Sequence, residues 1–179
     1  MMFACYYDSP LGKLLLTADA LGLTGLYFDG EKTEPDRLPF VHTERETPLL
    51  AETKRWLDVY FSGREPDFLP PLHPTGSAFR QAVWALLLQI PYGQTTTYGA
   101  IARQLAAKQG IPKMSAQAVG GAIGDNKIAI VIPCHRVIGA NGSLTGYAGG
   151  MNRKAALLEL EHTDMTGLFL PKKGPVRER

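Results

Sequence analysis

Cys134, His135 and Arg136 follow an apolar run and a proline, and they open a loop rich in glycine. A cysteine that only fills a core behaves as a small hydrophobe and gains nothing from polar neighbours. A thiolate is a nucleophile, but a free cysteine has a pKa of about 8.5 and needs a base or a positive charge beside it. The pattern therefore predicts nucleophilic chemistry at Cys134, with His135 as the nearest candidate base.

A histidine that acts as a base also needs a carboxylate to orient its imidazole ring. The predicted helix over residues 151–162 offers Glu159 and Glu161. Glu161 lies at the margin of the apolar stripe, whereas Glu159 falls on a different face, so Glu161 is the predicted partner. Neighbouring side chains on an extended backbone point to opposite sides. Contact between His135 and Cys134 therefore requires a water molecule or a turn.

Other uses of this cysteine stay open at this point. A cysteine hydrolase or transpeptidase would take its base from a separate segment, and His42, His73 and His162 are available, although none stands in a recognisable constellation. A metal site is disfavoured, because Cys134 and His135 lack the spaced partner ligands that zinc needs.

The segment before the cysteine predicts how the thiol is presented. Residues 127–132 read KIAIVI, a largely β-branched run that is typical of a strand buried on both faces. Pro133 keeps Ile132 extended and removes a backbone donor from the next turn. We therefore expect a strand that delivers Cys134 at its end.

Two helices joined by a short turn are predicted before that segment. Apolar residues at helical spacing indicate one helix between Tyr98 and Gly110, and Ser115 can cap a second over residues 116–126. The pair resembles a helix-turn-helix. Gly120 and Gly121 each weaken the second helix by about 1 kcal/mol relative to alanine. Either packing against another helix or close approach of a nucleic-acid strand would compensate.

The N-terminal part has the pattern of a structural unit and shows no sign of chemistry. Short apolar runs over residues 3–30, separated by turn residues, predict a small antiparallel meander. An amphipathic helix is expected from Thr47 and Pro48 up to Gly63, and its aromatic stripe, which includes Tyr60, is interpreted as core. A linker over residues 70–76 precedes a further helix over residues 77–90.

Composition and charge limit the class of protein. The 179 residues suffice for one large or two small domains, and two cysteines without a leader disfavour a secreted disulfide framework. No apolar run approaches the roughly 18 residues of a membrane span, so we expect a cytoplasmic protein. Residues 1–75 hold 7 Lys and Arg against 12 Asp and Glu, a charge of −5, while 12 against 5 give residues 76–179 a charge of +7. The asymmetry favours a polyanionic partner for the second half, with chance and a basic tail as the alternative.

Four segments now carry a resemblance to a known family. In order along the chain, IPYGQTTTYGAIA, AVGGAIGDN, IPCHRVIG and RKAALLELE resemble the O6-alkylguanine-DNA alkyltransferases. The resemblance implies an α+β fold: a small RNase-H-like α/β domain at residues 1–75, a mainly helical, winged-helix-like domain with a helix-turn-helix at residues 76–165, and a basic tail at residues 166–179.

The resemblance also implies an activity and a partner. The activity is DNA repair by irreversible, single-turnover transfer of an alkyl group from O6 of guanine to a cysteine, with no cofactor and no metal. The partner is double-stranded DNA that contains O6-alkylguanine, with O4-alkylthymine as a further candidate lesion. A monomer that does not bind membranes is expected.

Roles for single residues are carried over by position. Cys134 accepts the alkyl group, and His135 with Glu161 activates it through a bridging water molecule. Tyr98 donates a proton or hydrogen bond to the base, and Asn126 braces the active-site turn.

A second set of residues is expected to contact the guanine or the duplex. These residues are Val137 and Ala148, through their backbones, and Tyr147, as a wall of the alkyl pocket, with Ala116, Gln117, Gly120, Gly121 and Arg136 toward the DNA. Arg136 is alternatively a structural brace. Gln117 departs from the family, which carries there an arginine that enters the duplex in place of the extruded base. A non-catalytic binder, resembling the alkyltransferase-like proteins, is a further alternative, but those proteins lack the acceptor cysteine.

Overall fold

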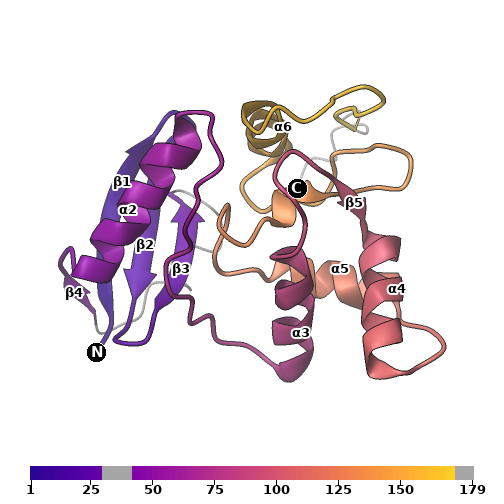
Figure 1. Cartoon of the computed structure of the whole chain (residues 1–179), viewed down its shortest axis with the longest axis horizontal. Helices are drawn as coiled ribbons and strands as arrows, with labels where there is room; N and C mark the ends of the chain where they lie inside the picture. The colour runs from indigo at the N-terminus through magenta and orange to yellow at the C-terminus, as the bar shows by residue number, and fades with distance from the viewer. Residues whose placement is uncertain (30–41, 172–179) are drawn as a thin grey trace, which may run out of the picture.

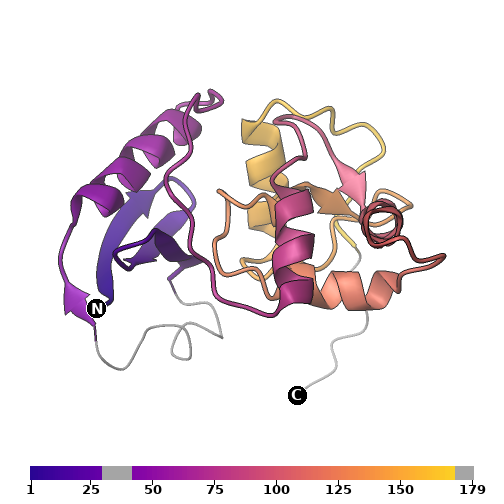
Figure 2. The same ribbon diagram turned by 60° about the horizontal axis from the view of Figure 1, so that its bottom comes forward.

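The chain folds into two lobes, and the computed structural model describes residues 1–29 and 42–171 (Figure 1). The N-terminal lobe is a sheet of strands β1 to β4 with helix α2, and the C-terminal lobe comprises helices α3 to α6 (Figure 2). The strands are β1 (Phe3–Ser9), β2 (Gly12–Ala18), β3 (Leu23–Phe28) and β4 (Thr43–Glu44). The first three form the predicted antiparallel meander, and β4 pairs in parallel with β1. Most of the predicted tail, residues 172–179, lies outside the described residues.

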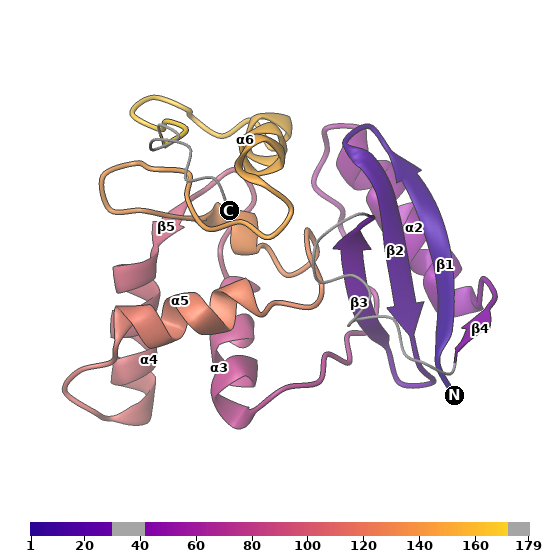
Figure 3. The same ribbon diagram turned by 180° about the vertical axis from the view of Figure 1, so that it is seen from behind.

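Helix α2 (Pro48–Phe61) covers one face of this sheet (Figure 3). It begins as predicted: the side chain of Thr47 accepts a hydrogen bond from the backbone N–H of Leu50, and Pro48 occupies the first turn, where no backbone donor is needed. Trp56 and Tyr60 are buried, so the interpretation of the aromatic stripe as core is confirmed. Tyr60 has no exposed surface at all.

Three helices form the body of the C-terminal lobe. They are α3 (Ala78–Leu87), α4 (Tyr98–Gln109) and α5 (Ala116–Gly124). The side chains of Ser77, Thr97 and Ser115 cap them, and Gly110 ends α4 in a left-handed conformation with a φ of 65°. The predicted helix-turn-helix of α4 and α5 is confirmed, and both helices pack against α3. Among the described residues, no helix is both long enough and apolar enough to cross a membrane.

The strand predicted over residues 127–132 is wrong, because this segment is a buried turn. Ile130 has a φ of 68°, and the backbone N–H of Ile132 donates to the carbonyl of Ile128 at 3.0 Å. Only Ile128 pairs with a strand residue, Leu26 of β3, in an isolated bridge. The run is apolar because it is enclosed where the two lobes meet, and hydrophobic periodicity cannot distinguish such a turn from a strand.

Beyond that turn the chain builds the region around the cysteine. It forms the short 3-10 helix η1 (Cys134–Arg136), strand β6 (Val137–Ile138), which pairs in parallel with β5 (Thr96–Thr97), and helix α6 (Met151–Leu160). Helix α6 packs against η1. The helix predicted over residues 151–162 is therefore confirmed, with Glu161 at its C-terminal cap.

Gly120 and Gly121 of α5 both leave room for a Cβ atom within the protein. A Cβ atom added to Gly121 would meet nothing within 4 Å, and one added to Gly120 would make an ordinary contact of 3.7 Å with the ring of Tyr98. Gly121 therefore does not pack against another helix, whereas Gly120 lies beside Tyr98 of α4 with room for a Cβ atom. Ala116, Gln117 and Gly121 are exposed, so α5 presents a surface that is nearly bare of side chains.

Gly121→Ala should raise the free energy of unfolding by about 1 kcal/mol, because alanine favours the helix and nothing occupies the space of its Cβ atom. Urea unfolding of both proteins measures the change. Gly110→Ala is the matched control, since a Cβ atom there also meets nothing within 4 Å but φ is 65°. That control should lower stability by about 1 kcal/mol. A destabilised Gly121→Ala variant would contradict the description of α5.

Candidate active site

Helix η1 presents the cysteine at a tight corner. Pro133 precedes it, and the carbonyl of Pro133 accepts a hydrogen bond from the backbone N–H of Arg136 at 3.1 Å. Such a turn sends successive side chains in different directions, which is the corner that the sequence required. Cys134 is 9% exposed, so its thiol is nearly shielded from solvent.

His135 and Glu161 form a pair whose side chains have no exposed surface. The Nε2–H group of His135 donates to Oε2 of Glu161 at 2.5 Å. The other ring nitrogen, Nδ1 of His135, makes no hydrogen bond with any residue that the structure describes. Nδ1 is thus the nitrogen left to take a proton from the neighbouring Cys134, directly or through one water molecule.

The environment sets the charges of this pair. Burial lowers the pKa of His135, and this effect outweighs the opposing hydrogen bond and charge of Glu161. Burial by itself would raise the pKa of Glu161, but the hydrogen bond with His135 and the ion pair with Arg136 outweigh it and bring that pKa to about 2. At neutral pH the site therefore holds a carboxylate and a neutral imidazole, which is the form that can accept a proton.

Arg136 lies behind the pair rather than at the protein surface. Its Nε–H donates to Oε1 of Glu161 at 2.7 Å, its Nη1 donates to the carbonyl of Ile90 at 2.7 Å, and its side chain is 11% exposed. These contacts are at odds with the expected DNA contact, because the guanidinium is engaged inside the protein. They match the alternative of a structural brace.

Asn126 ties together the turn that leads to the cysteine. Its Nδ2 donates to the carbonyl of Ile132 at 2.9 Å, and its Oδ1 accepts from the backbone N–H of Ile128 at 3.1 Å. Its side chain thus closes both ends of the buried turn. Because Pro133 and Cys134 follow directly, the position of Asn126 determines the direction in which η1 leaves.

Tyr98, the first residue of α4, faces the loop that follows β6. Its hydroxyl donates to the carbonyl of Thr145 at 3.1 Å. Burial and the nearby Cys134 raise the pKa of Tyr98, so the phenol keeps its proton at neutral pH. A protonated phenol close to the thiol is able to act as a general acid.

A small pocket adjoins the thiol. Its lining residues are Ile123, Gly124, Asn126, Ala129, Cys134, Gly146, Tyr147, Ala148 and Gly149. The expected Tyr147 and Ala148 are thus brought to Cys134, whereas Val137 is fully buried and does not line the pocket. The cavity measures about 10 Å³, enough for about one water molecule. A purine base can enter only if the walls move apart.

Two of the three other histidines, His73 and His162, form hydrogen bonds away from the thiol. His73 pairs with Asp19 at 2.6 Å, and His162 bonds to the carbonyl of Gly63 at 2.8 Å. Neither contact involves η1, which weakens the hydrolase alternative. Within residues 1–29 and 42–171, no group of three His, Cys, Asp or Glu side chains is placed to hold a metal ion.

Family comparison decides what kind of site this is. Residues 78–163 match the family described as "6-O-methylguanine DNA methyltransferase, DNA binding domain", and residues 2–74 match its "ribonuclease-like domain". The chain belongs to the 6-O-methylguanine DNA methyltransferase family. This membership confirms the resemblance in the cysteine region and the RNase-H-like interpretation of the N-terminal lobe.

Individual relatives of this methyltransferase family cover nearly the whole chain. A methylated-DNA–protein-cysteine methyltransferase of Mycobacterium leprae is 46% identical over 91% of this chain and 94% of its own length. One of Haemophilus influenzae is 40% identical over 89% of this chain and 86% of its own length. A solved structure of Mycobacterium tuberculosis OGT in complex with DNA has a TM-score of 0.77 and 43% identity over 89% of this chain and 92% of that chain.

The structure adds a residue that sequence reasoning about this methyltransferase missed. Lys154 is fully buried, and its Nζ donates to the carbonyls of Val137 and Thr145. Burial lowers its pKa to about 8. A signal was present, because Lys154 precedes Leu157, Leu158 and Glu161 at the spacing i, i+3, i+4 and i+7, on the buried stripe of α6.

Tyr60 is a second residue that sequence reasoning missed, and it comes from the other lobe. Its hydroxyl donates to Oε2 of Glu161 at 2.6 Å, across 101 positions of sequence. The spacing in α2 predicts that Tyr60 is buried, but no local pattern indicates which polar group its hydroxyl meets.

Lys154→Met should lower the free energy of unfolding by about 1 to 3 kcal/mol, because it leaves the buried carbonyl of Val137 without this donor, while the carbonyl of Thr145 keeps the Tyr98 hydroxyl. It should also slow alkyl transfer, since Val137 directly follows η1 and Thr145 directly precedes Gly146 in the pocket wall. Urea unfolding and single-turnover kinetics measure the two effects. Lys127→Met is the control, because it removes an exposed hydrogen bond from a lysine to the Thr75 hydroxyl. It should change neither the free energy of unfolding nor the transfer rate by a comparable amount.

The same lysine makes stability depend on pH. Its folded pKa is about 8 against an ordinary value of 10.5, so between these values the unfolded chain binds more protons. The contribution of Lys154 to the free energy of unfolding therefore rises with pH in this interval. The stability difference between the wild type and Lys154→Met should widen from pH 8 to pH 10, and a constant difference would contradict the lowered pKa.

Proposed function

We propose that this chain repairs alkylated DNA by moving one alkyl group from O6 of guanine to Sγ of Cys134, once per molecule. The observation that carries the proposal is the fully buried pair of His135 and Glu161 directly behind a nearly buried cysteine. Membership of the family and the DNA complex of the M. tuberculosis relative support it.

The chemical step follows from the positions of the groups. The proton of Cys134 passes to Nδ1 of His135 through one water molecule, and anionic Glu161 stabilises the imidazolium that forms. The thiolate then attacks the alkyl carbon: a carbon–sulfur bond forms, the bond from carbon to O6 breaks, and its electron pair stays on the guanine. Tyr98 donates a proton to the departing base. A thioether does not revert, so the molecule acts once and needs no dissociable cofactor.

Substrate entry requires two separate movements. The nucleotide must leave the base stack, at a cost of a few kcal/mol that is smaller for a poorly paired, damaged base. The pocket of about 10 Å³ must also widen. We propose that Tyr147 then forms one wall of the pocket for the alkyl group and that Ala148 and Val137 contact guanine through their backbones. The carbonyl of Val137 already accepts from Lys154 and keeps a second lone pair for this contact.

We propose that helix α5 enters a groove of double-stranded DNA. Ala116, Gln117 and Gly121 are exposed on it, and the other end of the same helix, at Ile123 and Gly124, lines the thiol pocket. One helix thus connects the proposed DNA surface with the site of chemistry. Arg136 acts in this proposal as the brace behind Glu161 and does not contact the duplex.

Finer features of the proposal concern assembly and scope. We propose a cytoplasmic monomer with a domain boundary at residues 75 and 76, which is supported by family matches that end at residue 74 and resume at residue 78. The pocket walls are backbone-rich, so O4-alkylthymine is proposed as a second lesion that the widened pocket can admit.

Cys134→Ala should abolish alkyl transfer and keep binding to methylated duplex DNA, because the thiol does the chemistry and other groups hold the DNA. Mass spectrometry after incubation with an O6-methylguanine oligonucleotide should show one persistent methyl group on the wild-type peptide that contains Cys134 and none on the variant. Cys5→Ala is the matched control, and it should transfer like the wild type. Methyl transfer by Cys134→Ala, or a wild-type adduct that hydrolyses away, would refute the proposal.

Gln117→Arg should accelerate repair of methylated duplex DNA by on the order of tenfold, since an added stacking or phosphate contact of about 1.4 kcal/mol corresponds to that factor. Reaction with the free base O6-benzylguanine should stay nearly unchanged, because only the duplex reaction includes base extrusion. Single-turnover rate constants of the wild type and the variant on both substrates show whether the substitution acts on base extrusion. Parallel changes on both, or no change on either, would show that Gln117 does not act at the extrusion step.

A further inference from the structure

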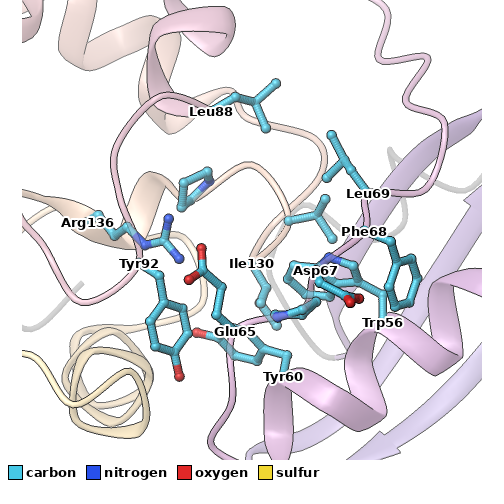
Figure 4. Close-up of a pocket in the computed structure, with 13 residues that line it drawn as sticks. Trp56, Tyr60, Glu65, Asp67, Phe68, Leu69, Leu88, Tyr92, Ile130 and Arg136 are labelled. Carbon is cyan, nitrogen blue, oxygen red and sulfur yellow. The ribbon is translucent and has the colours of Figure 1, made fainter.

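The hydroxyl group of Tyr60 crosses from the N-terminal lobe to the catalytic pair. It donates to Oε2 of Glu161 at 2.6 Å in a fully buried contact. Its ring stacks on Trp56 with centroids 5.2 Å apart and meets the edge of Tyr92 at 6.5 Å. Figure 4 shows these aromatic rings beside a cavity of about 630 Å³, whose walls also include Arg136. Aromatic packing from both lobes therefore holds the hydroxyl in place.

Each oxygen of Glu161 accepts from two groups. Oε2 accepts from Tyr60 and from Nε2 of His135, while Oε1 accepts from Arg136 at 2.7 Å and from the backbone N–H of Gly93 at 3.4 Å. Tyr60 is the donor that comes from the N-terminal lobe. It shares with His135 the oxygen that must stabilise the imidazolium during transfer.

The direction of this hydrogen bond is settled by the charges. Burial and the negative charge of Glu161 raise the pKa of Tyr60 well above its ordinary value, so the phenol stays protonated. The low pKa of Glu161 keeps its carboxylate ionised. Tyr60 is therefore a permanent donor to Oε2 and takes no part as an acid or base.

We infer that Tyr60 is a positioning residue for alkyl transfer, acting through Glu161 on His135, so that the N-terminal lobe is part of the catalytic machinery; this inference rests on the proposed function. The hydroxyl holds Oε2 in the line of the imidazole and shares part of its charge. Without the Tyr60 hydroxyl, Oε2 loses one of its two donors. The carboxylate then attracts a proton on His135 more strongly, because less of its charge is shared.

The proton affinity of His135 then rises and its alignment is lost. The other charged groups that face the imidazole are Arg136 and Lys154, and both oppose its protonation. The ring of Tyr147 meets that of His135 edge-on, with the ring centroids 6.5 Å apart. The hydrogen bond of the Tyr60 hydroxyl goes to Glu161 and to none of these groups. The change at His135 is therefore attributable to Glu161.

The test is Tyr60→Phe in the full chain, with single-turnover methyl transfer followed over a range of pH. We expect the rate constant at neutral pH to fall by on the order of tenfold, as loss of a charge-assisted hydrogen bond allows. We also expect the acidic limb of the pH–rate profile to move to higher pH, so that the deficit narrows under alkaline conditions. The amplitude of the reaction reports how many molecules are folded and active, and the rate constant reports how fast each of them reacts. A purely structural role would therefore lower the amplitude and leave the rate constant and the acidic limb of the pH–rate profile unchanged.

Tyr7→Phe is the matched control. Tyr7 also donates to a carboxylate at 2.6 Å, that of Asp58 on helix α2, but this contact is exposed and involves neither Glu161 nor η1. The control should transfer at the wild-type rate. If the wild type itself transfers no methyl group, the proposed function fails; if it does and Tyr60→Phe matches it in rate and pH limb, this inference alone fails.

A double-mutant cycle with Glu161→Gln tests whether Tyr60 acts through Glu161. If Tyr60 acts through Glu161, then adding Tyr60→Phe to Glu161→Gln should slow transfer by much less than tenfold and should leave the pH limb where Glu161→Gln puts it. Additive effects of the two substitutions would overturn the inference.

Discussion

The buried carboxylate of Glu161 is the constraint on which the arrangement of this protein depends. Removing a charged carboxylate from water costs several kcal/mol unless donors surround it. Here the donors come from segments far apart in sequence: η1 supplies His135 and Arg136, the turn after α3 supplies Gly93, and α2 supplies Tyr60. The relative positions of α6, η1 and the N-terminal lobe are thus coupled to one carboxylate. The same coupling aligns His135 beside the thiol, while burial keeps its imidazole neutral.

Side chains that bond to the backbone shape the rest of the site. Asn126 closes the buried turn before Pro133, and Lys154 holds the carbonyls of Val137 and Thr145. Irregular backbone inside a protein requires such partners, because an unpaired buried carbonyl or N–H group is costly. The cysteine therefore occupies a rigid corner although its neighbours form neither a long strand nor a long helix.

The N-terminal lobe contributes to the site at more than one point. Besides Tyr60, the ring of Phe28 on β3 meets the edge of Tyr147 at 6.4 Å, and a Cβ atom added to Gly149 would come within 2.8 Å of that same ring. The loop that walls the thiol pocket thus rests against the sheet. Any movement of this loop that widens the pocket therefore changes its contact with β3.

The sequence by itself determined the helices, their caps and the chemistry at Cys134, because capping, periodicity and thiol reactivity are local properties. It also identified Glu161 as the partner of His135, since the margin of an apolar stripe is visible in the spacing. Only the tertiary structure decided that residues 127–132 form a turn, because enclosure between two lobes produces the same apolar pattern as a buried strand. The roles of Lys154 and Tyr60 were likewise decided in space, since the carbonyls and the carboxylate that their polar ends meet lie on distant segments.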